Sequence, residues 1–142
     1  MRKIWCFGLL VLVLAISATG ICAADVPDLV GNWVGSGPGY QEGTGYVVGV
    51  DYGNLTFTIA EQKGRVFNGE MTYQLNETDV VEGFAGAIGL DNKTFYIAEF
   101  ISGYDVGTII SEDTIELIYI QDGEQDGEPG ETFVQMLRRV VE

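Results

Sequence analysis

Apolar and polar side chains alternate along much of the chain beyond residue 24, as in a β-strand with one face against a core. The clearest case is 65–75, where Phe67, Met71 and Tyr73 alternate with polar residues. Leucine, phenylalanine and isoleucine alternate with threonine just before it, over 55–60, and a short turn separates the two runs. The two segments are therefore expected to form a β-hairpin.

The same alternation recurs at short intervals, while no segment beyond residue 24 has the periodicity of a helix. Eight strands are predicted, at about 29–36, 55–60, 65–75, 80–90, 94–101, 104–111, 114–121 and 132–141. Most connections are too short for a parallel crossover, which takes a dozen or more residues, so neighbouring strands are expected to be antiparallel. Eight such strands predict a closed up-and-down barrel, which leaves no exposed sheet edge. A β-sandwich is the alternative.

The first 24 residues have a different pattern and predict export. Arg2 and Lys3 precede 21 uncharged residues that are mostly apolar and end in Ala23-Ala24. A basic head, an apolar run and a small-residue exit define a signal peptide. Cleavage would leave residues 25–142 as one secreted or cell-surface domain without cysteine. An uncleaved anchor is an alternative, because a bilayer needs about 20 apolar residues, and lipid modification of Cys22 is another.

A resemblance rests on Gly31-Asn32-Trp33, near the predicted mature start. This triplet is similar to the G-x-W opening strand of the calycins, the group of lipocalins, fatty-acid-binding proteins and avidins. The rhythm of 64–73 also resembles an avidin hairpin strand. The resemblance implies a small ligand-binding barrel in which a basic residue of the last strand, Arg138 or Arg139, packs over Trp33.

Charge narrows the choice of partners. Beyond residue 24 there are 21 acidic and five basic residues, for a net charge of −16. A field of this sign repels nucleic acid and anionic lipid, so neither is expected as a partner, nor is a membrane after cleavage. Cations, basic partners or neutral molecules are the expected partners. An acidic surface that serves only solubility is the simplest interpretation.

The residue types that are missing exclude several chemistries. The sequence has no histidine, and both cysteines, Cys6 and Cys22, lie in the predicted signal peptide. Ser-His-Asp and Cys-His catalysis and the usual zinc sites are therefore excluded for the mature domain. Glu99 and Glu116 share strand faces with apolar residues, where the pKa of a carboxyl can be raised as in acid catalysts. An outward orientation of both carboxylates is the simpler interpretation, and no enzyme activity is predicted.

One acidic loop resembles the first half of a calcium-binding loop. Asp122, Glu124 and Asp126 occupy positions 1, 3 and 5, with glycine at position 6. Phe133 stands at position 12, where a bidentate glutamate belongs. Ca²⁺ is therefore the single cofactor considered, with a flexible charged loop as the alternative.

The segment 37–53 is rich in glycine and tyrosine and is too long for a hairpin turn. Tyrosine offers a flat apolar face with a hydroxyl group, which suits contact with a ligand, and long loops in small domains are often functional. We expect this segment to cover one end of the barrel, although 46–50 could instead add a ninth strand. The expected ligand-binding residues are Trp33, Tyr40, Tyr46, Tyr52 and Tyr104.

Three sequons begin at Asn54, Asn76 and Asn92, all in turns or at strand starts. Such positions are accessible to a glycan if the cell glycosylates exported proteins. Taken together, the sequence predicts a secreted, non-catalytic barrel that binds a small neutral or cationic ligand. The alternative is a structural or interaction protein at the cell surface, with a packed barrel interior and a protein partner. The sequence predicts no oligomeric state.

Overall fold

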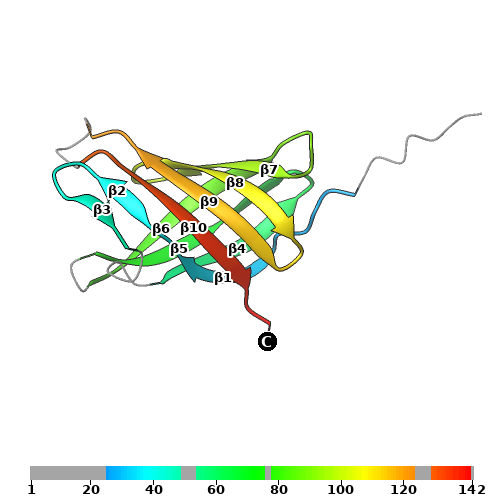
Figure 1. Cartoon of the computed structure of the whole chain (residues 1–142). Helices are drawn as coiled ribbons and strands as arrows, with labels where there is room; N and C mark the ends of the chain where they lie inside the picture. The colour runs from blue at the N-terminus through cyan, green and yellow to red at the C-terminus, as the bar shows by residue number, and fades with distance from the viewer. Residues whose placement is uncertain (1–24, 49–53, 76–77, 124–128, 142) are drawn as a thin grey trace, which may run out of the picture.

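The computed structural model describes residues 25–48, 54–75, 78–123 and 129–141, and this part of the chain is all β (Figure 1). Among these residues, no helix is long and apolar enough to cross a membrane. The strands are β1 (Gly31–Ser36), β2 (Gly39–Gln41), β3 (Gly45–Val47), β4 (Leu55–Lys63), β5 (Val66–Leu75), β6 (Thr78–Ile88), β7 (Thr94–Glu99), β8 (Tyr104–Ser111), β9 (Thr114–Gln121) and β10 (Glu131–Arg139).

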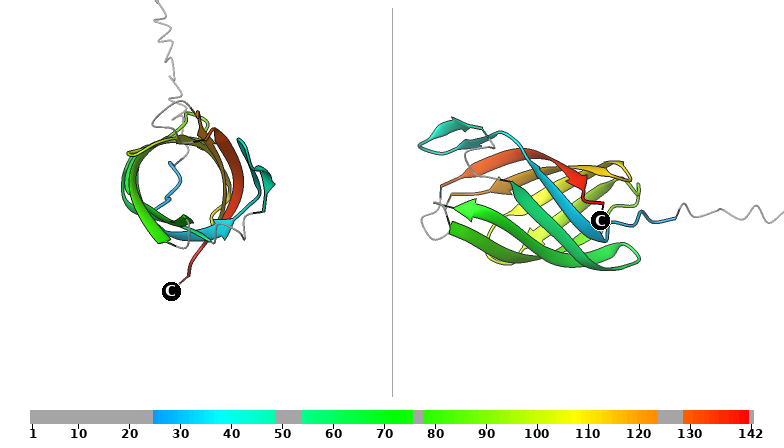
Figure 2. Two further views of the ribbon diagram at one scale, coloured as in Figure 1. Left: turned by 90° about the vertical axis from the view of Figure 1, so that its left-hand side faces the viewer. Right: turned by 90° about the horizontal axis from the view of Figure 1, so that it is seen from below.

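Eight of these strands form a closed antiparallel barrel. From β4 to β10 each strand pairs with the next along the chain, and β1 closes the ring by pairing with both β4 and β10. The end-on view shows the ring, with the N-terminal segment visible through it (Figure 2, left). The predicted up-and-down barrel is therefore confirmed, and the β-sandwich alternative is wrong.

The two remaining strands lie within the segment that was expected to be a loop. β2 continues the line of β1 along β10 in the same register, from Trp33 opposite Arg139 to Gly39 opposite Phe133. β3 then folds back on β2. Gly43 and Gly45 have φ values of 78° and 90° in this turn, a conformation that glycine adopts without the strain of a side chain. Residues 39–47 thus form a hairpin beside β10 rather than a loop.

The barrel interior is filled with apolar side chains toward the end where the chain enters. Trp33, Phe57 and Phe84 are fully buried there, and the rings of Phe57 and Phe84 stack with centroids 4.3 Å apart. Two interior rings are accommodated by glycines on neighbouring strands, because a Cβ at Gly86 or Gly107 would overlap the ring of Phe67 or Phe95. The narrow barrel therefore packs large aromatic rings against bare backbone.

The N-terminal segment closes this end of the barrel, and Arg139 holds it in place. The guanidinium group lies 4.2 Å from the centre of the Trp33 ring and donates to the carbonyl oxygens of Asp28 and Val30. The Trp33 indole N–H in turn donates to the carbonyl of Leu29, which is 1% exposed. The contact of a last-strand arginine with Trp33, which the resemblance implied, is present.

Candidate ligand-binding site

The opposite end of the barrel is hollow. A cavity of about 330 Å³ lies where β1, β5, β7 and β9 end and where β4, β6, β8 and β10 begin. One part of its wall is apolar and consists of Leu55, Met71, Val80, Ile101 and Phe133. The barrel is therefore a cup with a packed base and an open mouth.

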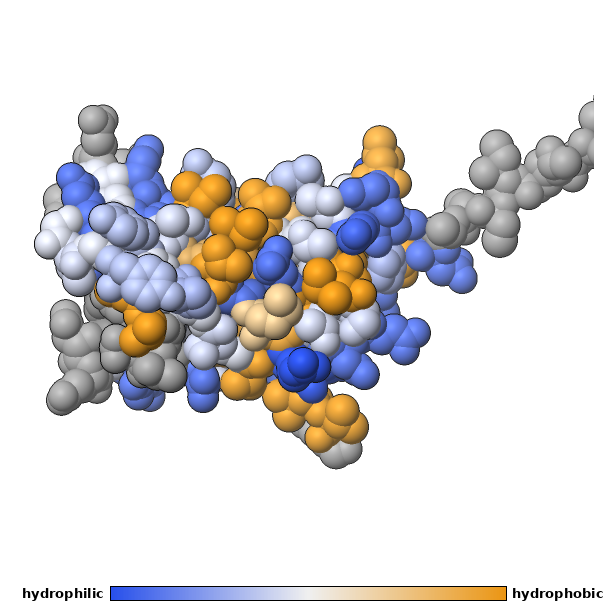
Figure 3. Space-filling view, in the orientation of Figure 1, coloured by the Kyte–Doolittle hydropathy of each residue, from blue (hydrophilic) through white to orange (hydrophobic). Residues whose placement is uncertain are grey.

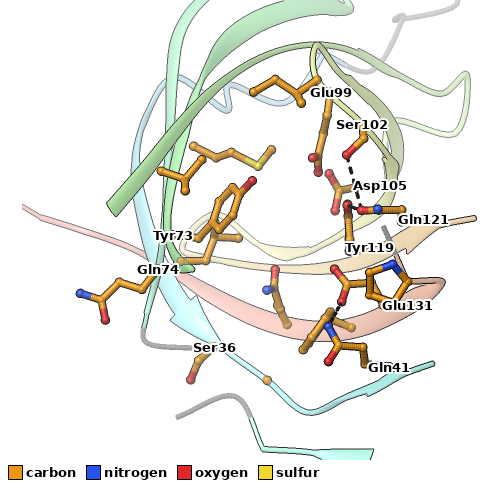
Figure 4. Close-up of a pocket in the computed structure, with 18 residues that line it drawn as sticks. Ser36, Gln41, Tyr73, Gln74, Glu99, Ser102, Asp105, Tyr119, Gln121 and Glu131 are labelled. Atoms are coloured by element: carbon orange, nitrogen blue, oxygen red, sulfur yellow. Dashed lines mark hydrogen bonds between the residues drawn. The ribbon is translucent and has the colours of Figure 1, made fainter. Parts of the chain in front are cut away.

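The other part of the wall is polar and largely acidic (Figure 4). Its side chains come from β5 and from β7 to β10 and include Tyr73, Glu99, Asp105, Tyr119 and Glu131. The strand register explains this grouping, because Asp105 lies opposite Tyr119, and Tyr119 lies opposite Phe133 on the other side. Gln41 of β2 also reaches the cavity, where its amide donates to Glu131 at 2.9 Å.

Glu82 lies beside the cavity wall and supports it without lining the cavity. This carboxylate is 2% exposed and accepts hydrogen bonds from the backbone N–H groups of Ile101 and Ser102, and from the Tyr73 hydroxyl at 3.3 Å. A buried carboxylate is stable where several donors compensate for lost hydration. Glu82 thereby anchors the turn between β7 and β8, which carries Glu99 and Asp105 on either side.

Glu99 and Asp105 form a hydrogen-bonded carboxyl pair. Burial raises the pKa of Glu99 far above its usual range, and the negative charge of Asp105 raises it further. Burial also raises the pKa of Asp105, while the hydrogen bond with Glu99 opposes this effect and lowers it. Two close carboxyl groups in a low-dielectric site share a proton because both cannot ionise cheaply. At neutral pH, Glu99 therefore carries the proton and Asp105 the charge.

The two cavity tyrosines are donors. Burial and nearby carboxylates raise the pKa of Tyr73 to about 12, and the same causes raise the pKa of Tyr119. Both hydroxyls therefore keep their protons at physiological pH. Tyr73 donates to Glu82, and Tyr119 donates to the side-chain oxygen of Gln121.

The structure places the aromatic residues selected from the sequence away from the cavity wall. Trp33 is in the core, and Tyr40 and Tyr46 are 62% and 68% exposed as a cross-strand pair on the hairpin. Tyr104 is 52% exposed, one residue from the inward-facing Asp105. Tyr52 lies outside the described residues. A role of these aromatic residues in ligand binding remains a prediction, and the cavity itself uses Tyr73 and Tyr119 instead.

The two glutamates considered for acid–base chemistry face opposite ways. Glu99 points into the barrel in line with Phe95 and Ile97, and its pKa is raised as expected for a carboxyl on an apolar face. Glu116 lies between the fully buried Ile115 and Leu117, so strand alternation places it on the outer face. The outward interpretation therefore holds for Glu116 and not for Glu99.

The expected calcium loop is described only in part. Asp122 follows β9, whereas Glu124 and Asp126 lie outside the described residues. Within the described ranges, no group of three or more histidine, cysteine, aspartate or glutamate side chains could hold a metal ion.

Of the sequons, Asn54 is exposed before β4, Asn92 is half-buried in the turn before β7, and Asn76 is not described. Calcium binding and glycosylation both remain predictions.

Two acidic wall residues, Asp105 and Glu131, and the buried Glu82 beside the wall were not selected from the sequence. Around Asp105 the outward positions Tyr104, Val106 and Ile110 are the more apolar set, which suggests the opposite orientation. The orientation of the other two acids could be inferred from their own strands, because side chains two residues apart point to the same face. Glu82 and Glu131 each lie two residues from a buried phenylalanine, Phe84 and Phe133, on the side nearer the mouth.

Fold and site together define a class: a small closed antiparallel β-barrel with a packed base and an acidic cavity at its mouth. Comparison with protein-family models, with curated proteins and with solved structures finds no match.

Proposed function

We propose that this protein is a secreted binding module that holds a small neutral or cationic ligand in the mouth of a calycin-like barrel, without catalysis. The observation that carries the proposal is the cavity, whose wall combines apolar side chains with Tyr73 and Tyr119. Small-molecule sites are typically concave and mostly apolar, with a few polar groups that fix orientation.

The distribution of charge supports a neutral or cationic ligand. Beyond residue 24 the chain has five basic residues, namely Lys63, Arg65, Lys93, Arg138 and Arg139. All five lie at the packed end, in the β4–β5 and β6–β7 turns and at the end of β10. The carboxylates of the cavity therefore face no cationic side chain among the described residues that line it. An anionic ligand would be repelled.

Native mass spectrometry of protein purified from its host tests this proposal. We expect a non-covalent mass that is lost on denaturation. Val80→Trp should abolish this mass, because the added ring fills the cavity. The matched control is Val81→Trp, since Val81 is 57% exposed on the outer face of the same strand. Retention of the ligand by both variants would place the binding site elsewhere.

A protein-interaction role is the second candidate, and the outer face of the barrel favours it. Apolar side chains gather across β8, β9 and β10 (Figure 3), where Ile118 lies opposite both Val106 and Val134. Exposed apolar groups on adjoining strands are typical of surfaces that meet a partner. If no small molecule is found in the native protein and the two tryptophan variants behave alike, this role replaces the binding module.

A further inference from the structure

Asp105 has a feature that the fold alone does not explain. Its side chain lines the cavity and is 3% exposed, yet its buried Oδ2 atom accepts no hydrogen bond (Figure 4). A buried carboxylate oxygen without a donor has lost its hydration with no hydrogen bond in exchange, which costs free energy. Such an atom is expected to meet its donor in a bound state.

Among the neighbouring groups, the protonated Glu99 carboxyl donates to Asp105, but this hydrogen bond leaves the negative charge of Asp105 without a cationic partner. The titratable side chains around Asp105 are Tyr73 on β5, Glu82 on β6, Glu99 on β7, Tyr119 on β9 and Glu131 on β10. The Tyr73 hydroxyl donates to Glu82 and the Tyr119 hydroxyl donates to Gln121. No lysine or arginine is among the described residues that line the cavity.

We propose that the ligand is a protonated amine with a compact apolar body, and that its ammonium group donates to Asp105 Oδ2. This inference rests on the proposed function and specifies its ligand class. An ammonium group supplies a donor for Oδ2 and the positive charge that the lining residues lack. A metal ion fits less well, since no group of three or more histidine, cysteine, aspartate or glutamate side chains among the described residues is arranged to hold one.

The remaining wall fits the body of such a molecule. Leu55, Met71 and Phe133 form an apolar surface facing the acidic side of the same cavity. The volume of about 330 Å³ lies near the lower end of the roughly 300–1,000 Å³ typical of small-molecule sites. An aryl-ethylamine has these features: one ammonium group on a short chain and one flat apolar ring.

The carboxyl pair contributes one negative charge to the site, in addition to that of Glu131. Glu99 retains its proton because of burial and the Asp105 charge, so the pair carries a single negative charge at neutral pH. One ammonium group neutralises it. Protonation of Asp105 at acidic pH removes that charge, and amine affinity should therefore fall as the pH is lowered.

Isothermal titration calorimetry with matched probes tests the proposal. The probes are 2-phenylethylamine and tryptamine, each compared at neutral pH with the alcohol that replaces its amino group. We expect each amine to bind at least about tenfold more tightly than its alcohol, because charge-assisted hydrogen bonds are about twice as strong as neutral ones. Asp105→Asn should remove this preference, with folding checked by circular dichroism.

Two further variants separate charge from structure. Glu99→Gln replaces a protonated carboxyl of the cavity wall with a neutral donor of similar shape. Both affinities are expected to change, but each amine should still bind more tightly than its alcohol, because Asp105 keeps its charge. Glu116→Gln removes an outer-face carboxylate of the same barrel and should leave the amine preference unchanged. A preference that survives Asp105→Asn would contradict the assignment of this residue.

The result also distinguishes this inference from the proposed function. If the amine and the alcohol bind with equal affinity, and both fail to bind to the Val80→Trp variant, the amine assignment is overturned. The proposal that the protein is a binding module is then retained. Failure of both amines to bind would likewise overturn the amine assignment, and the ligand found by native mass spectrometry would then define the class. If the native protein also carries no ligand, the proposed function fails.

Discussion

At the scale of single residues, Trp33 and Arg139 join the first and last strands of the barrel. Trp33 is fully buried, and Arg139 covers its ring while holding the carbonyl groups of the N-terminal segment. This contact at the packed end of the barrel could be expected from the sequence, because the G-x-W triplet and the arginine in the last strand are both visible as short local motifs. The contact therefore couples closure of the barrel to docking of the entering chain.

Truncating this tryptophan should be costly. Trp33→Ala is expected to lower the free energy of unfolding by ~3–5 kcal/mol, as other large core truncations do. Chemical denaturation monitored by circular dichroism measures the loss. As a control, Tyr104→Ala removes a half-exposed ring on the outer face and should cost much less. A loss below ~1 kcal/mol for Trp33→Ala would mean that the ring does not support the core.

The carboxyl pair predicts the pH dependence of stability. Because the pKa values of Glu99 and Asp105 are raised in the folded protein, the folded state holds protons that the unfolded chain releases. This contribution is fully present below the ordinary carboxyl pKa of about 4, and it is lost as the pH rises toward the folded-state values. The melting temperature should therefore be higher at pH about 5 than at pH about 8.

Variants isolate this contribution from the repulsion among surface acids. Combining Glu99→Gln with Asp105→Asn should flatten the pH dependence and raise the melting temperature at alkaline pH, whereas Glu116→Gln should change it little. Melting curves recorded across this pH range provide the measurement. If the melting temperature changes equally with pH in the double variant and in the wild type, the surface charge alone sets this pH dependence.

At the scale of elements, the eight barrel strands were predictable, whereas the site was not. Turn residues and alternation locate strands because both signals are local. They do not tell which face of β8 is inward, since one face carries Asp105, Gly107 and Ile109 and the other carries Tyr104, Val106 and Thr108. The β2–β3 hairpin was expected as a loop, with one additional strand at 46–50 as the alternative. Its strands are three residues long and depend on β10, a partner far along the chain.

The hairpin gives a test of where the ligand binds. Tyr40 and Tyr46 face each other across it and do not line the cavity, whereas Gln41 between them does. Replacing both tyrosines by serine should leave the affinity for the amine probes unchanged, while Gln41→Leu should alter it. Calorimetry of the two variants decides the matter. A large loss in the tyrosine variant would instead support the earlier expectation of an aromatic site on this segment.

At the scale of the whole molecule, the position of the N-terminal segment bears on processing. Leu29 is buried against the packed end and Gln62 bonds the Pro27 carbonyl and the Leu29 N–H. Cleavage after Leu29 would remove this closure. The Ala23-Ala24 exit lies upstream of these contacts, which is compatible with a mature chain that starts near Asp25.

N-terminal sequencing of protein from the host checks this expectation. We expect Asp25, or a residue within a few positions of it, as the first residue of the exported form. Replacing Ala23 with a bulky residue should slow processing, because signal cleavage requires small side chains at the exit. Recovery of intact Met1 from a membrane fraction would favour the uncleaved anchor.

The segregation of all five basic residues at the packed end makes the barrel an electric dipole along its own axis. The mouth is the negative end of this dipole, because no basic side chain of the described residues lies near its carboxylates. A cation approaching from solution is therefore attracted toward the opening before any contact forms. Capture would then be fast and sensitive to ionic strength, since a screening length of about 10 Å at 0.1 M salt is shorter than the barrel. The slower dissociation step, governed by contacts inside the cup, would change little with salt.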